Sequence, residues 1–201
     1  MDIFYTCLFL FMIGSFCGWC IELLFRRFFS TKRWVNPGFL NGPYLPLYGF
    51  GVVAMYGICS IPIDLLWKIV IIVVSMTLIE YITGLIFIKG LKIKLWDYSA
   101  RWGNLQGIIC PLFSAIWGIC GVVFLFVIYP LLSTASVWLS VHKNFLFVIG
   151  LFYGVFAVDI AISFKLSSRI RKIAKEIKEV VEFESLKQQI ESYAKTNKKS
   201  Y

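Results

Sequence analysis

Five long apolar runs dominate this chain and restrict it to folds that lie within a membrane. About 20 helical residues, each rising 1.5 Å, cross the roughly 30 Å hydrocarbon layer, so an apolar run of that length predicts a spanning helix. No segment shows the alternation of polar and apolar residues typical of membrane β-strands. We therefore predict an all-α, polytopic integral membrane protein with five transmembrane helices near residues 3–25, 44–61, 65–88, 107–129 and 144–164.

Composition agrees with this class. Of the 201 residues, 59% are hydrophobic and 15% are charged, whereas soluble domains have about 45–50% apolar and about 25% charged residues. The first run lacks the basic start and the small-residue cleavage site of a secretory signal, so we expect it to remain in the bilayer.

The basic residues predict the orientation of the helices. Eighteen of the 20 lysine and arginine residues lie in three segments, 26–43, 89–106 and the chain after residue 164. Basic residues close to membrane spans remain cytoplasmic, so we predict an N-terminus outside and a C-terminus inside, as an odd number of spans requires. The net charge of +9 then favours contact with anionic lipid headgroups rather than nucleic acid.

The chain contains an apparent internal repeat. The stretches GFLNGPYLPLY from Gly38 and GNLQGIICPLF from Gly103 both fit G-x-L-[N/Q]-G-x-x-x-P-L-[Y/F]. Each follows a predicted span and a basic loop, and each precedes a span that returns outward. We therefore predict two hairpins of the same orientation, 3–61 and 65–129, related as in transporters built from parallel repeats.

Each residue type in the repeat has a physical use at the start of a helix. Glycine permits a positive φ or a close backbone approach, and proline is tolerated in the first helical turn. We expect Asn41 and Gln106 to cap the free N–H groups at the two helix starts. Such irregular backbone can bind an anionic ligand group at the helix N-terminus, and it would equally serve two capped helix starts without any ligand.

Three acidic residues fall within the predicted spans, and all three lie in the cytoplasmic half. An unpaired carboxylate there costs several kcal/mol, about 2.5–3.5 on insertion scales, so embedded acids often mark binding sites or ion paths. Two have simple structural alternatives, since Glu22 precedes Arg26 by one turn and Asp159 can pair with Lys165 or the tail. Glu80 has no basic residue nearby in sequence, although Arg101 is a candidate partner.

The acids, amides and phenols on this membrane face predict a polar cavity that opens to the cytoplasm. The candidate substrate-binding residues are Glu22, Asn41, Tyr44, Tyr48, Glu80, Asp97, Tyr98, Arg101, Asn104, Gln106 and Asp159.

The chain after Lys165 changes in character. Isoleucines at 170, 173 and 177 begin an apolar stripe with helical spacing, which predicts a cytoplasmic amphipathic helix able to pair with another helix, bind a protein or lie on the inner membrane surface. We therefore divide the chain into a transmembrane bundle over 1–166, whose fifth helix is 144–164, and a cytoplasmic helix and tail over 167–201.

The Gly14/Gly18 and Gly150/Gly154 pairs predict close helix packing, within the bundle or in a homo-oligomer.

The sequence indicates no catalytic residues, metal ligands or cofactor. The six cysteines all fall in predicted spans, and His142 is the only histidine. Neither a nucleophile–base pair nor a metal-ligand spacing is recognisable, so we expect no enzyme activity, disulfide or zinc site. A membrane enzyme that acts on lipid is the function that the sequence supports least among the alternatives.

The motifs NPGFLNGPYLPLYGFG, EYITG, WDYS and NLQGIICPLFSAIWG resemble the putative ABC-transporter permease family labelled type IV or CmpB-like, over roughly residues 10–130. The resemblance implies a small bacterial cytoplasmic-membrane protein with about five spans. A second family glutamate, usually near position 88, is Ile88 here. The family pattern otherwise falls on Asn41, Gly42, Pro43, Tyr48, Glu80, Asp97, Tyr98, Asn104 and Gly107.

We therefore expect a permease-like subunit of a transport system. The chain contains no G-x-x-x-x-G-K-[S/T] phosphate loop, so ATP hydrolysis would need a separate ATPase. The alternative is a non-catalytic membrane scaffold or partner protein that acts through its C-terminal helix. The expected partners are the lipid bilayer, an ATPase or other membrane subunit, and a second copy of the chain, with no nucleic acid.

Overall fold

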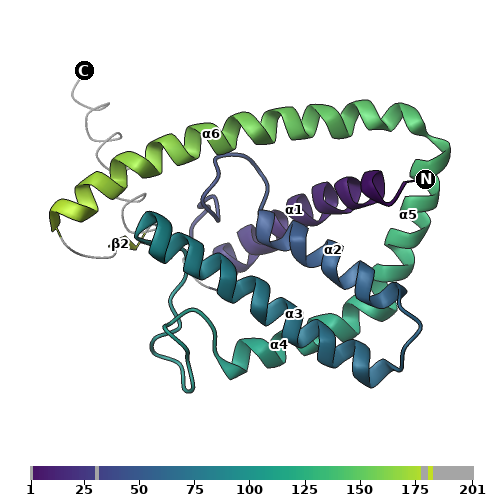
Figure 1. The fold of residues 1–201 in the computed structure, drawn as a ribbon, viewed down its shortest axis with the longest axis horizontal. Coiled ribbons are helices and arrows are strands. Elements are labelled where there is room, and N and C mark those ends of the chain that lie inside the picture. Colours follow the sequence, from purple (N-terminus) through teal and green to yellow (C-terminus); the bar gives the residue numbers. More distant parts are fainter. Residues whose placement is uncertain (1, 30–31, 178–180, 183–201) are drawn as a thin grey trace.

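The protein is a bundle of tilted helices (Figure 1), seen in a computed structural model that describes residues 2–29, 32–177 and 181–182. Apart from one pair of two-residue strands, the described part is all-α. The elements are α1 (Ile3–Phe28), α2 (Pro46–Ser60), α3 (Leu65–Leu85), the π-helix η1 (Ile86–Leu91), β1 (Ile93–Lys94), α4 (Pro111–Val123), the π-helix η2 (Phe124–Ile128), α5 (Tyr129–Val141), the 3-10 turn η3 (Lys143–Phe145), α6 (Leu146–Ile177) and β2 (Val181–Glu182).

Among the described residues, four helices are long and apolar enough to cross a membrane. The prediction of a multi-pass helical membrane protein is therefore confirmed. The four are Ile3–Phe28, Leu65–Leu91, Pro111–Val141 and Lys143–Lys165, of which the last is the least buried inside the fold.

The second predicted span, 44–61, forms the shorter helix α2 of 15 residues. At 1.5 Å per residue this helix is about 22 Å long, less than the roughly 30 Å hydrocarbon layer. Its first residue is Pro46, and the extended backbone of Ile61 ends it, because the α conformation is disfavoured before Pro62. Prolines therefore set both ends of α2.

The fourth predicted span, 107–129, has different limits in the structure. Residues 107–110 lie in the loop, and the helix begins at Pro111 and continues through η2 into α5, which ends at Val141. Pro130 cannot donate to the helical hydrogen-bond ladder, and the wide turns of η2 lie just before it. Figure 1 shows the resulting bend, after which α5 runs towards the start of α6.

Helices α1 and α2 pack closely through two glycines. A Cβ added at Gly14 would lie 2.7 Å from the Cβ of Val52, and one added at Gly18 would lie 2.3 Å from the Cβ of Tyr48. The small-residue pair predicted in the first span therefore serves packing within the chain. At Gly150 and Gly154 of α6, by contrast, an added Cβ would meet no described atom within 4 Å.

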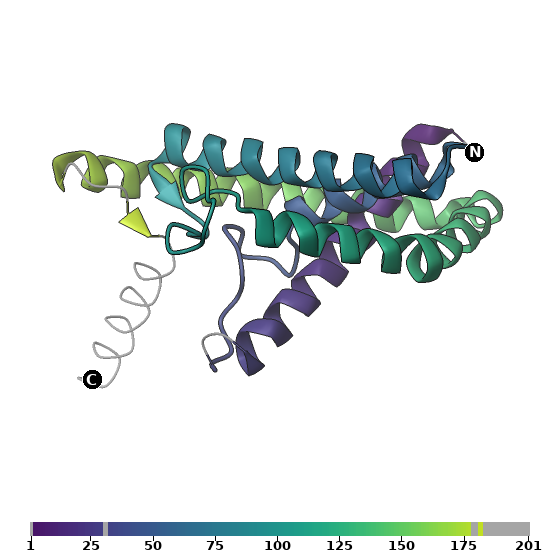
Figure 2. The same ribbon diagram turned by 90° about the horizontal axis from the view of Figure 1, so that it is seen from below.

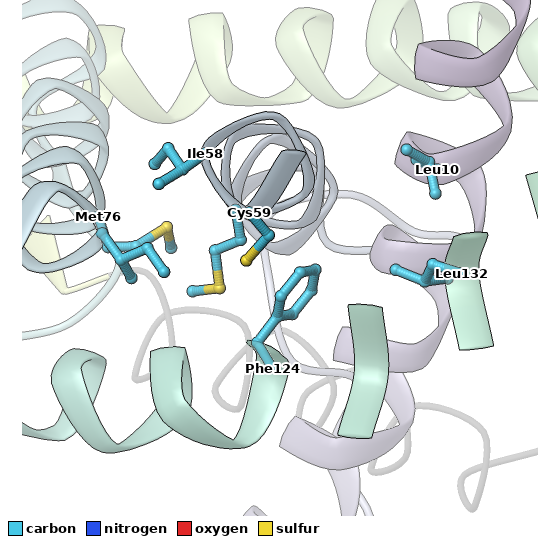
Figure 3. Packing of buried hydrophobic residues seen from close by; sticks show 8 residues of the cluster. Leu10, Ile58, Cys59, Met76, Phe124 and Leu132 are labelled. Carbon is cyan, nitrogen blue, oxygen red and sulfur yellow. The ribbon is translucent and has the colours of Figure 1, made fainter. Parts of the chain in front are cut away.

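A buried apolar cluster joins α1, α2, α3, η2 and α5 (Figure 3). Ile72 and Met76 of α3 are almost wholly buried within it, and an added Cβ at Gly121 of α4 would lie 2.9 Å from Ile72. The two halves of the chain therefore share one core. The buried members are Leu10, Met55, Ile58, Cys59, Ile72, Met76, Phe124 and Leu132.

The loops that precede α2 and α4 lie at the same end of the bundle (Figures 1 and 2). We call residues 32–45 loop one and residues 95–110 loop two. Phe39 of loop one packs on Ile93, which is fully buried just before loop two, and its ring lies 5.3 Å from that of Phe164 in α6. The fold therefore brings both repeated motifs into one region of the bundle, as the predicted cavity would require.

The packing of α1 on α2 supplies a first prediction. Gly18→Ala should lower the free energy of unfolding by about 1–3 kcal/mol, because the new methyl group would overlap Tyr48 and push α2 away. The measurement is thermal or denaturant unfolding in one detergent. The matched control is Gly154→Ala, which has free space around it and should change stability little. Equal stability of the two variants would contradict the close contact.

Candidate functional site

Asp159 of α6 is buried against loop one and accepts five hydrogen bonds. Its Oδ1 accepts from the backbone N–H of Asn41 at 3.2 Å, the side-chain amide of Asn41 at 2.9 Å and the hydroxyl of Ser163 at 3.1 Å. Its Oδ2 accepts from the backbone N–H of Gly42 at 2.7 Å and from the Tyr44 hydroxyl at 2.6 Å. Four of the five hydrogen bonds therefore come from loop one and the fifth from Ser163 of α6. None of the five comes from Lys165, the partner considered from the sequence.

Loop one is held in shape by a second asparagine. The Asn36 side chain donates to the carbonyls of Leu40 and Asn41 at 3.2 and 2.8 Å, and it accepts a 2.6 Å hydrogen bond from the Trp19 indole. The ring of Tyr44 lies over Gly42, where an added Cβ would be 2.3 Å from the ring. Glycine at position 42 is needed because the Tyr44 ring lies too close to the backbone for any side chain to fit.

Glu80 of α3 is buried, with 4% of its surface exposed. Its Oε1 accepts from the Tyr98 hydroxyl of loop two at 3.0 Å, and its Oε2 accepts from the Trp117 indole of α4 at 3.2 Å. The Tyr98 ring stacks on Phe113 with centroids 4.2 Å apart. The carboxylate is therefore paired with a phenol and an indole, while Arg101, its candidate partner from sequence, is exposed.

Glu22 of α1 forms the third carboxylate contact. It receives a 3.0 Å hydrogen bond from the Tyr48 hydroxyl of α2 and a 3.0 Å salt bridge from Arg26 one turn later. The i,i+4 pair considered from sequence is thus present. The two predicted hairpins are alike in this respect. The first helix of each carries a glutamate, Glu22 or Glu80, that accepts a hydrogen bond from a tyrosine later in the chain.

Loop two is built from its own polar side chains. Asp97 accepts from the Lys94 ammonium at 2.8 Å and from the backbone and hydroxyl of Ser99. Asn104 donates to the carbonyls of Ser99 and Arg101 and accepts from the backbone N–H of Gly107 at 3.0 Å. Asp97 and Asn104 therefore maintain the shape of the loop, and their polar atoms are used within it.

Two predicted roles need correction. Asn41 and Gln106 do not cap helices, because α2 and α4 follow Leu45 and Cys110 and have no side-chain cap. Asn41 instead binds Asp159 and Ser163, and Gln106 is an exposed residue with a φ of 58°. Loop two turns through Gln106 and Gly107, whose φ is 69°. Asn41 therefore bonds to α6, and Gln106 occupies a turn, instead of capping a helix.

Two side chains of loop two have shifted pKa values. The hydrogen bonds from Lys94 and Ser99 hold the pKa of Asp97 well below its ordinary value, at about 2, so it is ionised at neutral pH. Burial, followed by the nearby Glu80 carboxyl, raises the pKa of Tyr98. The Tyr98 phenol therefore keeps its proton at neutral pH and donates it to the hydrogen bond with Glu80.

Seven of the predicted residues are joined to one another by direct hydrogen bonds. Asn41, Tyr44 and Asp159 form one group, and Glu22–Tyr48 and Glu80–Tyr98 form two further pairs. The sequence analysis missed Ser163 and Trp117 as partners. Ser163 was recognisable as the residue one turn after Asp159, whereas nothing local relates Trp117 to Glu80.

The carboxylates are held without a metal centre in the described part. Among those residues no group of three or more His, Cys, Asp or Glu side chains lies close enough to hold a metal ion.

An open surface hollow of about 620 Å³ lies at the turn between α2 and α3, at the opposite end from the two loops (Figure 1). It is lined by Pro62, Ile63, Asp64, Trp67 and Ile71, so it is separate from the carboxylate contacts. Buried acids paired with phenols can exchange protons or bind a polar solute when the pairs separate.

A known protein family matches most of the chain. A family described as "Putative ABC-transporter type IV" matches residues 9–164. The chain belongs to this family. No curated protein and no solved structure matches the chain.

The match to the type IV ABC-transporter family covers all eleven candidate residues, from Glu22 to Asp159, and ends in α6 just before Lys165. The C-terminal segment after residue 164 lies outside the match.

Proposed function

We propose that this protein is the permease-like membrane subunit of a transport system in the bacterial cytoplasmic membrane. The observation that carries the proposal is the pair of acids within predicted spans, the buried Glu80 and the partly buried Glu22, each hydrogen-bonded by a tyrosine. Acidic residues inside membrane segments are rare and often mark substrate or ion paths. The description of its family supports transport over other uses.

The proposed topology has five spans, an external N-terminus and a cytoplasmic C-terminus. It treats α2 as a short span, and the two hairpins as repeats that begin their returning helices at Pro46 and Pro111. The end of the bundle that carries both loops also carries the basic segments 26–43 and 89–106, which favours a cytoplasmic position. A polar cavity would form there when the Tyr48 and Tyr98 regions separate.

The proposed subunit catalyses no covalent reaction and works with a separate ATPase. The sequence has no phosphate-binding loop of the ATPase type. The basic loops supply exposed surface for such a partner, including Arg101 and Trp102, which is 87% exposed. A second copy of the chain is a further proposed partner.

One observation favours the scaffold alternative. Helix α6 continues without a break from its apolar part to Ile177, 12 residues beyond Lys165, so it extends about 18 Å past the last basic boundary residue at 1.5 Å per residue. A helix projecting in this way suits recruitment of another protein. The apolar stripe predicted along it, and the final residues, lie outside the part whose side chains are described.

The test of the proposed function is association with an ATPase. We expect the full chain, affinity-purified from its native membranes in mild detergent, to carry a vanadate-sensitive ATPase activity that an unrelated membrane protein with the same tag lacks. Arg101→Glu combined with Trp102→Ala should remove this activity while leaving the melting temperature unchanged, because both side chains are exposed. ATPase-free preparations of the wild-type chain would contradict the transport role.

A further inference from the structure

Loop one presents its hydrogen-bond donors as a ligand site does. Two donors, the backbone N–H and the side-chain amide of Asn41, converge on one oxygen of Asp159. Two more, the N–H of Gly42 and the Tyr44 hydroxyl, converge on the other oxygen. Successive backbone N–H groups that point to one anion form an anion-binding concavity, and the shortest contacts, 2.6 and 2.7 Å, have the lengths of charge-assisted hydrogen bonds.

The shape of loop one is maintained largely by parts of the chain other than α6. Asn36 donates to the carbonyls of Leu40 and Asn41 and accepts from the Trp19 indole of α1. The Leu45 N–H donates to the Ser15 carbonyl of α1 at 2.9 Å. The backbone of the loop is therefore held largely by α1 and by Asn36, whereas the Asn41 amide and the Tyr44 ring also contact α6.

Helix α6 is the least buried of the four candidate spans, and a Cβ added at its Gly150 or Gly154 would meet no described atom within 4 Å. Away from loop one, it contacts α1 through the buried Ile149 and through a hydrogen bond from the Tyr153 hydroxyl to the Leu8 carbonyl. Near loop one its attachment consists of Asp159, Ser163 and the rings of Phe152, Phe156 and Phe164.

We propose that residues 41–44 form a carboxylate-binding site, whose ligand in this conformation is Asp159 of α6 and which takes the carboxylate of a solute when α6 moves away. The solute class rests on the proposed transport function, whereas the site itself rests on the geometry. Two donors for each of two oxygens match the lone pairs of a carboxylate. In a variant that lacks the Asp159 side chain and keeps α6 in place, the additional oxygens of a phosphate would face the Phe152 and Phe156 rings that pack on Tyr44.

The test is chemical rescue in the full chain. Asp159→Gly removes the tethered carboxylate and leaves a space of its size beside the loop donors. In detergent, sodium formate should raise the melting temperature of this variant by about 2–4 °C over sodium chloride at equal ionic strength. Formate should leave the wild-type chain and Asp159→Leu unchanged, because their own side chains occupy the site. Adding Tyr44→Phe to Asp159→Gly should reduce the rescue.

Other outcomes would overturn the proposal. These are stabilisation by phosphate but not formate, an equal effect of formate on Asp159→Leu, or no effect of formate on Asp159→Gly. If Asp159→Gly does not fold in chloride, it is purified in formate, where recovery of folded protein supports the site and failure in both salts opposes it. The readout is unfolding rather than transport, so its failure would leave the ATPase association test of the proposed function unaffected.

Discussion

Replacing Asp159 with leucine should lower the free energy of unfolding by about 3–5 kcal/mol, the cost typical of removing one partner from a buried charged network. The replacement leaves the N–H groups of Asn41 and Gly42 and the Tyr44 hydroxyl without an acceptor. Each buried unsatisfied group costs about 1–3 kcal/mol. Leucine itself is favourable in a membrane helix, so the loss would come from loop one rather than from the insertion of α6.

The measurement combines denaturant unfolding in detergent with amide hydrogen exchange. Exchange at Asn41 and Gly42 should accelerate strongly in Asp159→Leu, while amides in the centre of α3 should be little changed below the unfolding transition. Ser163→Ala is the matched control, since it keeps the carboxylate and all four loop donors and should cost about 1 kcal/mol. Wild-type protection at Gly42 in Asp159→Leu would show that Asp159 does not hold the loop.

Replacing Glu80 with glutamine should slow transport strongly while preserving the fold. The glutamine oxygen can accept from Trp117, and its amide can donate to the Tyr98 oxygen, so both contacts survive without the charge. We expect stability to change by about 1 kcal/mol or less, since loss of the charge also removes its desolvation cost. A charged hydrogen bond contributes about 1.5–3 kcal/mol, so its loss to the transported group should slow transport about 10- to 100-fold.

Untargeted mass spectrometry can measure this effect without a known substrate. Cells that express the wild-type chain with its partner ATPase should differ from empty-vector cells in the level of one or more solutes, and Glu80→Gln should remove that difference. Trp117→Phe is the control, because it removes one hydrogen bond but keeps the carboxylate, and it should keep most of the difference. Deletion of residues 168–201 separates the two functions, since loss in the deletion alone, with Glu80→Gln active, would favour the scaffold.

The long apolar runs were sufficient to predict a helical multi-pass protein, because the hydrophobic length that a bilayer requires is a local property of the chain. The helix starts were predicted less well, since the predicted spans began at residues 44 and 107, whereas α2 and α4 begin at Pro46 and Pro111. The continuation of the fourth helix through η2 to Val141 was not predicted, because a short run of polar residues after Pro130 reads as a helix end when the sequence is considered alone.

The sequence also identified the chemically important side chains but not their partners. Embedding an acid in an apolar run is visible locally, so Glu22, Glu80 and Asp159 could be selected without a structure. The partner of Glu22, Arg26, lies one turn away and was recognisable from helical spacing. Tyr98 and Trp117 are 18 and 37 residues from Glu80, and only the folded chain brings them to it.

By itself, then, the sequence determined the membrane class and the acids that need an explanation, because both depend on the physical chemistry of a short segment. The tertiary structure alone decided that Asn41 binds Asp159, 118 residues away, rather than capping its own helix. That choice depends on where α6 packs, and a buried carboxylate takes whichever donors the packing brings within hydrogen-bond distance.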